Sequence, residues 1–199
     1  MPARLHLTAL LLFCPTLLAQ GPAKKYPAEI LLIRHAEKPP DRDASPHLSP
    51  AGEKRAKALP ALFVKSDARP APFARPDALF AAADSKKSNR PTATLAPLAK
   101  ELKLPVNATF HNAPGGAGGE KGIAELAAEV LGGRHEGKVV LICWRHGHMP
   151  DLAHALGARG PLKYPSPEFG RVWRITFDAD GRAKLVDLPQ RLMPGDSRR

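Results

Sequence analysis

The sequence predicts a three-layer α/β/α sandwich, with a mostly parallel central sheet, helices on both of its faces and an antiparallel C-terminal hairpin at the edge. Two short apolar runs, residues 30–33 and 139–144, suit strands that are buried on both faces. Segments with helical periodicity alternate with the predicted strands, which favours parallel pairing. The hairpin is expected from two strand-like segments, residues 171–177 and 182–188, which a glycine-containing turn joins.

A polar, proline-rich loop at residues 38–49 follows the first strand and leads into the first helix. Ser49 can cap this helix, and Pro50 stands in its first turn, where a missing backbone N–H is tolerated. Pro60 predicts a kink or an early end. A second strand is expected at residues 78–83.

The next predicted helix begins near Arg90 and is followed by a weakly specified strand at residues 106–110. Two further helical patterns, at residues 123–131 and 150–156, flank the strand at residues 139–144. This alternation leads us to expect one domain.

The glycine-rich segment at residues 111–120 superficially suggests a phosphate-binding loop. A P-loop ends in Gly-Lys followed by Ser or Thr, whereas this segment ends in Gly119 and Glu120, and a carboxylate there would repel phosphate. We therefore expect a flexible lid or a plain surface loop.

The domain organisation is predicted from the ends of the chain. Residues 1–19 have the charged start, short apolar centre and small-residue exit of a secretory signal; an N-terminal anchor or a helix of the fold is the alternative. The domain then covers residues 26–190, and residues 191–199 are expected to form a disordered tail. Cleavage would leave a secreted or periplasmic protein without stable membrane insertion.

The chain of 199 residues has a formal net charge of +11, which indicates a preference for anionic partners. Its basic residues are scattered, and only 6% of its residues are aromatic, so no nucleic-acid partner is expected. A phosphorylated small molecule or a phosphorylated envelope component is the expected substrate. No heptad repeat or large apolar patch predicts an oligomeric state.

An Arg-His pair follows each of the two apolar runs: Arg34 with His35, and Arg145 with His146. Open α/β sheets bind ligands at the carboxyl ends of their strands, so neighbouring strands would bring the two imidazoles together. Arg90, at a helix start, adds a third guanidinium. Such groups can hold the oxygens of a phosphoryl group while a neutral imidazole attacks phosphorus. The alternative is a pair of ordinary core histidines.

Four motifs resemble, in order, those of the histidine phosphatase superfamily, which has the phosphoglycerate mutase-like fold. They are Leu32-Ile-Arg-His-Ala-Glu-Lys-Pro39, Leu48-Ser-Pro-Ala-Gly-Glu53, Ser88-Asn-Arg-Pro-Thr-Ala-Thr94 and Val140-Leu-Ile-Cys-Trp-Arg-His146. The resemblance implies that His35 is the phosphorylated nucleophile, that Arg34 and Arg90 hold the phosphoryl oxygens, and that His146 completes the pocket.

The general acid and the role of Arg145 are left open. Many members of the family have a Glu or Asp after the third strand, where this chain offers Glu120; Glu37 is a second candidate, with a salt-bridging or loop-orienting role as the alternative. Arg145 either adds phosphate affinity or points outward. His148 is expected to line the pocket, and we expect neither a metal nor a cofactor.

The sequence therefore predicts an exported, metal-independent phosphatase that hydrolyses a phosphomonoester through a phosphohistidine. The alternatives are a non-catalytic phosphate- or anion-binding protein of the same fold, a phosphomutase, and a protein that attaches to anionic envelope polymers through its basic surface.

Overall fold

The structure is a computed structural model. It describes residues 26–40, 43, 45–66, 71–111, 122–166 and 168–197. The predicted signal segment (1–19) and Glu120 lie outside the described residues.

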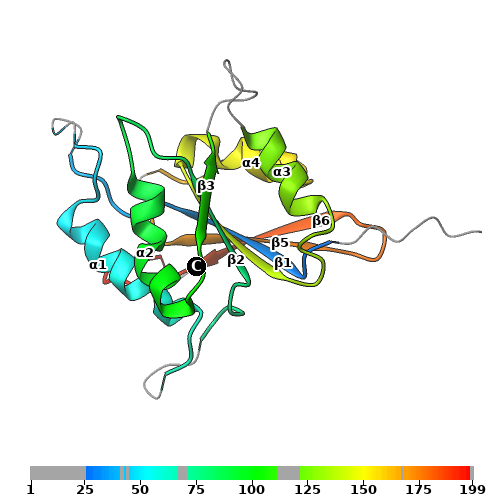
Figure 1. The fold of residues 1–199 in the computed structure, drawn as a ribbon, viewed down its shortest axis with the longest axis horizontal. Helices are drawn as coiled ribbons and strands as arrows, with labels where there is room; N and C mark the ends of the chain where they lie inside the picture. The colour runs from blue at the N-terminus through cyan, green and yellow to red at the C-terminus, as the bar shows by residue number, and fades with distance from the viewer. Residues whose placement is uncertain are drawn as a thin grey trace, which may run out of the picture.

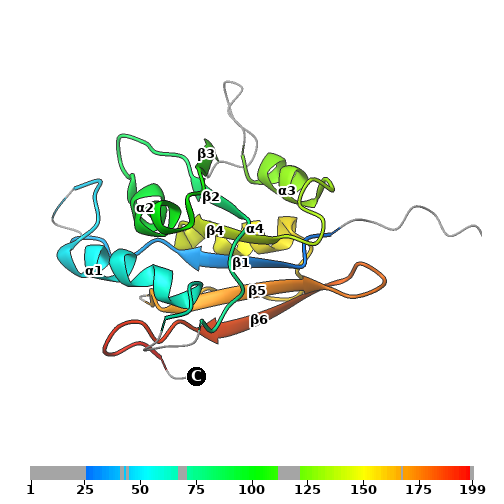
Figure 2. The same cartoon turned by 60° about the horizontal axis from the view of Figure 1, so that its bottom comes forward.

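A six-stranded sheet forms the centre of the molecule, in the order β3-β2-β4-β1-β5-β6 (Figures 1 and 2). The strands are β1 (Glu29–Arg34), β2 (Ala78–Ala82), β3 (Val106–Phe110), β4 (Val139–Trp144), β5 (Arg171–Phe177) and β6 (Ala183–Pro189). β1, β4, β2 and β3 pair in parallel, and β5 pairs antiparallel with both β1 and β6. A mostly parallel sheet with a C-terminal hairpin at one edge is thus confirmed.

Helices cover both faces of this sheet. They are α1 (Pro50–Ala58), the 3-10 turn η1 (Leu59–Leu62), α2 (Arg90–Leu102), α3 (Ile123–Leu131), the 3-10 turn η2 (His146–His148) and α4 (Met149–Ala155). α1 and α2 lie together on one face, and α3 and α4 lie together on the other (Figure 1). The predicted three-layer architecture is confirmed.

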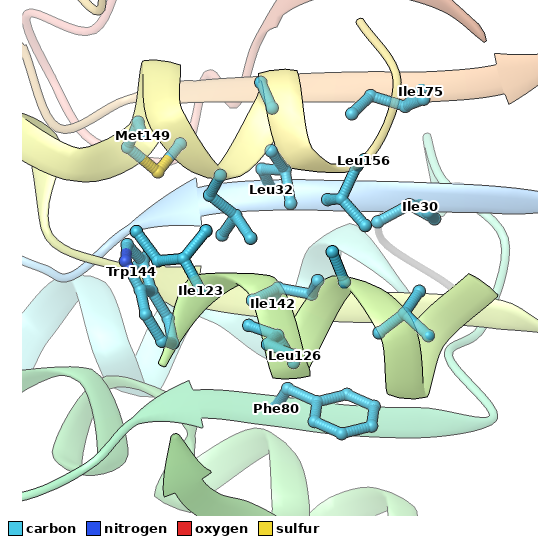
Figure 3. Close-up of a cluster of buried hydrophobic side chains, with 14 of the residues drawn as sticks. Ile30, Leu32, Phe80, Ile123, Leu126, Ile142, Trp144, Met149, Leu156 and Ile175 are labelled. Carbon is cyan, nitrogen blue, oxygen red and sulfur yellow. The ribbon is translucent and has the colours of Figure 1, made fainter. Parts of the chain in front are cut away.

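Both faces of β1 are buried, which explains why residues 30–33 are all apolar and do not alternate with polar residues. Ile30 and Leu32 pack with α3 and α4 in one buried cluster (Figure 3), whereas Leu31 and Ile33 pack beneath α2 in the other. All four side chains have no exposed surface. Burying each stabilises the fold by about 1.5–3 kcal/mol relative to exposure, so the sequence cannot alternate with polar residues here.

The start and end of α1 follow from three residues. The Ser49 side chain accepts a hydrogen bond from the backbone N–H of Gly52 at 3.1 Å, and Pro50 begins the helix. The α-helix gives way to η1 just before Pro60, as expected from a residue that cannot donate to the helical ladder. Among the described residues, no helix is long and apolar enough to cross a membrane.

The C-terminal segment differs from the expected disordered tail. In its described part, residues 191–197, the Asp196 side chain is only 6% exposed and binds the Arg55 guanidinium of α1 at 2.7 Å. It also accepts hydrogen bonds from the backbone N–H groups of Leu192 and Met193. An ion pair leaves no hydrophobic periodicity in the sequence, so these contacts could not be predicted from the pattern.

Candidate active site

The two Arg-His pairs lie side by side at the carboxyl edge of the sheet. β1 and β4 are parallel neighbours, with Arg34 opposite Trp144. The backbone N–H of His35 donates to the Trp144 carbonyl at 3.0 Å. η2 then begins at His146. The start of α2 brings Arg90 to the same edge.

These side chains line a pocket of about 290 Å³. Its lining residues are Arg34, His35, Lys38, Lys87, Ser88, Arg90, Arg145, His146, Gly147 and His148. Five of them are lysines or arginines and three are histidines, and none of the described lining residues is a carboxylate. Such a pocket favours a compact anion.

His35 presents one ring nitrogen as a nucleophile. The residue is 5% exposed, and its Nδ1 lies 2.7 Å from the Ala36 carbonyl oxygen. Because a carbonyl can only accept, Nδ1 carries the proton and Nε2 of the neutral ring keeps its lone pair. Burial, together with the charges of Arg34 and Arg90 and the nearby His146, lowers the pKa of His35 to about 3 even though the bond to the carbonyl opposes this. The ring is therefore neutral near pH 7.

Arg34 lines the pocket and is held in place by two contacts. Its Nη1 donates to the Glu168 carbonyl at 3.0 Å, and its Cζ lies 3.8 Å from the ring centroid of Phe169. Burial lowers its pKa, and its buried Nε has no hydrogen-bond partner among the described residues. A buried cation with a spare donor is stabilised when an anion binds.

Arg90 and Arg145 complete a cluster of three guanidiniums. Arg90 donates to the carbonyls of Ser45 and Lys87 at 3.3 Å, and Arg145 donates to the Ser85 hydroxyl at 3.3 Å. The Nε of each is buried without a partner among the described residues. Of the two alternatives for Arg145, the structure supports a position in the pocket wall.

The remaining histidines differ in setting. Burial, followed by the charges of Arg34 and Lys38 and by His148, lowers the pKa of His146. The His148 side chain is 43% exposed, and its Nδ1 lies 3.6 Å from an Asp151 carboxylate oxygen. In the described part of the chain, no three His, Cys, Asp or Glu residues gather as metal ligands would.

Comparison with known proteins places the fold. No family model and no curated protein matches the sequence. A solved structure of a candidate alpha-ribazole-5'-P phosphatase from Escherichia coli matches with a TM-score of 0.54 at 15% identity, over 84% of this chain and 98% of that one. The chain has the phosphoglycerate mutase-like fold.

Two other structures of this fold match with lower scores. The protein histidine phosphatase SixA complexed with tungstate gives a TM-score of 0.47 at 14% identity, over 81% of this chain and 97% of that one. A phosphoglycerate mutase from Bacillus anthracis gives 0.46 at 10% identity, over 83% of this chain and 94% of that one.

The two predicted acids are not among the described lining residues of the pocket. Glu120 lies outside the described residues. Glu37 turns to α1, where its carboxylate accepts from Nε and Nη2 of Arg55 at 2.8–3.1 Å. The geometry of Glu37 matches the salt-bridging alternative.

Sequence reasoning missed two residues around the pocket. Phe169 lies in an irregular segment before β5, where nothing in the pattern signals contact with Arg34. Lys87 is one of the scattered basic residues of the sequence, and the structure places it in the pocket lining. Its position between the second strand and Arg90 is the signal that could have indicated this.

Proposed function

We propose that this protein is a phosphatase that hydrolyses a phosphomonoester through a phosphohistidine at His35. The observation that carries the proposal is the neutral imidazole of His35, whose Nε2 is unprotonated, in a pocket lined by five lysines and arginines. Both the attacking lone pair and the charges that a phosphoryl group needs are present at one point.

In the first step, Nε2 of His35 attacks phosphorus in line with the leaving oxygen, so that the N–P bond forms as the P–O bond breaks. Arg34 and Arg90 hold the non-bridging oxygens, and His146 donates a further hydrogen bond. The leaving oxygen takes up a proton, for which the sequence offers Glu120. In the second step, water attacks phosphorus and gives a proton back to the group that protonated the leaving oxygen, the N–P bond breaks, and inorganic phosphate leaves.

Turnover of an aryl phosphate by the wild type and two variants tests the proposal. We expect His35→Ala to lose at least about 1,000-fold in kcat, because the covalent route needs this nitrogen. His154→Ala is the matched control, since His154 is an exposed histidine outside the pocket. Full activity of His35→Ala would refute the mechanism.

A non-catalytic anion-binding protein is the second candidate, favoured by the lack of a carboxylate among the described lining residues. Calorimetry with inorganic phosphate gives the same result for both functions. Turnover of an aryl phosphate, whose leaving group needs little protonation, separates them. A sugar phosphate then tests for a general acid, because its leaving oxygen is far more basic.

A phosphomutase is the third candidate. With a substrate that carries a labelled phosphoryl group, a phosphomutase would pass the label to another hydroxyl of the substrate or product, whereas a phosphatase releases labelled inorganic phosphate.

Dialysis of the protein against a chelator is expected to leave its phosphatase activity unchanged, because the proposed steps use only side chains of the protein.

Export is part of the proposal and is supported by the signal-like pattern of residues 1–19. The mass of the protein recovered from a secreting host tests it. Loss of a segment that ends near Ala19 is expected, and a product that keeps the apolar stretch would favour an anchor. The proposed substrate is then a phosphorylated small molecule or an envelope component, with no nucleic-acid partner.

A further inference from the structure

A buried ion cluster lies beside the candidate active site and centres on Arg55 of α1. The residue is 5% exposed, and every N–H of its guanidinium has an acceptor. Nε and Nη2 donate to Glu37, Nη1 and Nη2 donate to Asp196 at 2.9 and 2.7 Å, and Nη1 also donates to Gln190 at 3.2 Å. The cluster therefore ties the C-terminal segment to the loop that follows β1.

Asp196 is held as firmly as its partner. Burial disfavours its carboxylate, but hydrogen bonds from Arg55, Met193 and Leu192 outweigh this and lower its pKa. Burial likewise opposes the charge of Arg55, and the bonds to Asp196 and Glu37 raise its pKa. Because each group supports the charge of the other, removing Asp196 leaves the buried Arg55 with Glu37 as its remaining carboxylate partner in the cluster.

Glu37, the member of the cluster nearest to His35 in the sequence, is joined to it by the short peptide of residues 35–37. Glu37 is two residues beyond His35, and its backbone carbonyl accepts from the Ser49 N–H at 2.9 Å. Between them, the Ala36 N–H donates to the Thr94 hydroxyl at 2.9 Å, and the Ala36 carbonyl is the acceptor for the His35 ring. The orientation of the imidazole thus depends on where this peptide is held.

The same C-terminal segment also braces Arg34. The Gln190 N–H donates to the Gly170 carbonyl at 2.8 Å. A Cβ on Gly170 would come within 2.7 Å of the Asp196 carboxylate, so the two segments are in close contact. Gly170 follows Phe169, whose ring lies against the Arg34 guanidinium.

We propose that Asp196 is a positioning residue for the nucleophile, acting through Arg55 and Glu37 on the peptide that carries His35. This inference rests on the proposed function of His35 and deepens it. Asp196 touches no reacting atom, since it does not line the phosphate pocket. Its role is to keep Nε2 in line with the phosphoryl group, and a displacement of about 1 Å can cost about 100-fold in rate.

Steady-state kinetics of Asp196→Ala, Asp196→Asn and Asp196→Glu test the positioning role. We expect Asp196→Ala to lower kcat about 10- to 100-fold with little change in KM, because Arg34 and Arg90 keep their own hydrogen bonds to the carbonyls of Glu168, Ser45 and Lys87. Asp196→Glu is expected to restore part of kcat. Asp180→Asn is the control, since Asp180 is an exposed aspartate in the β5–β6 turn.

Acetate provides a test that a purely structural role would fail. A cavity of about 380 Å³, lined in part by Glu37, Arg55 and Asp196, gives a small carboxylate room beside the guanidinium. We expect acetate to raise kcat of Asp196→Ala but not of the wild type or of Asp196→Glu. An Asp196→Ala protein that is fully folded at the assay temperature and has the kcat of the wild type would overturn the proposal.

A nitrogen-15 NMR measurement of His35 separates this inference from the proposed function. In protein saturated with inorganic phosphate, the ring signals of His35 are expected to shift in Asp196→Asn, which preserves shape, and to stay unchanged in Asp180→Asn. A shift supports positioning by Asp196 even if the wild type proves not to be an enzyme. Unchanged His35 signals in folded Asp196→Asn would overturn the inference even if the wild type is a phosphatase.

Discussion

The protonation state of His35 depends on two residues that flank it in the sequence. The Ala36 carbonyl fixes which ring nitrogen carries the proton, and Arg34 disfavours a second proton. Burial is the largest cause of the lowered pKa. A histidine in water would be partly protonated near pH 6.5 and could not attack phosphorus in that form.

The lowered pKa of His35 also predicts how stability depends on pH. The unfolded chain binds a proton at His35 below about pH 6.5, whereas the folded ring stays neutral down to about 3, so the stabilisation is lost as pH falls through this window. Between pH 7 and pH 4.5 the loss is about 2 to 3 kcal/mol. Denaturant unfolding of the wild type and of His35→Asn measures it; equal losses in both would contradict the assignment.

Arg145 is expected to matter for binding more than for folding. Arg145→Gln removes one of several like charges, so the ligand-free protein keeps or gains thermal stability, while inorganic phosphate binds about 10-fold more weakly. Thermal melts with and without phosphate measure both effects. Arg182→Gln, at an exposed arginine of the β5–β6 turn, is the control; unchanged phosphate affinity in Arg145→Gln would place Arg145 outside the binding site.

At the scale of elements, α1 packs directly on the peptide that follows the nucleophile. Gly52 allows this contact, because a Cβ at that position would collide with the Glu37 carbonyl oxygen. The motif residues of the first helix thus support the active-site loop and do not line the pocket.

Gly52→Ala is expected to destabilise the protein by about 1 to 3 kcal/mol and to lower kcat, because the Glu37 backbone must move. Urea unfolding and turnover of an aryl phosphate measure the two effects. Ala51→Ser, at the exposed neighbouring position, should change neither. A stable and fully active Gly52→Ala would show that this contact is not needed.

The sequence predicted the elements that carry the site because local signals mark them. Apolar runs that end in Arg34 and Arg145 locate the strand ends, and Ser49 and Pro60 locate the limits of α1. The parallel pairing of β1 with β4 then brought the two histidines together.

Contacts between distant residues could not be predicted in the same way. Arg55 and Asp196 are 141 positions apart and belong to segments without a shared pattern, so their ion pair became visible only in the fold. The same reason explains the missed contact between Arg34 and Phe169. Glu37 has the right chemistry for an acid, but its pairing with Arg55 decides where it points.

At the scale of the whole molecule, the net charge of +11 has the same sign as the pocket, whose lining includes five lysines and arginines. We expect the net charge to draw an anionic substrate to the protein, and the three guanidiniums of the pocket to bind it. Salt weakens the long-range part of this attraction but affects the buried contacts less.

We therefore expect kcat/KM for an aryl phosphate to fall several-fold between about 20 and 200 mM salt, while kcat changes little. Stopped-flow or steady-state measurements at constant pH test this. Sodium chloride is the suitable salt, because sulfate and phosphate would compete for the pocket. A kcat/KM that does not depend on salt would show that the net charge has no part in substrate capture.

The most direct test of the account is to trap the phosphorylated protein by rapid quench with a labelled substrate and to locate the label by mass spectrometry. The account predicts an acid-labile, base-stable phosphoryl group on His35 that forms at least as fast as turnover and is absent from His35→Asn. Turnover without a covalent intermediate, or a label on any other residue, would contradict it.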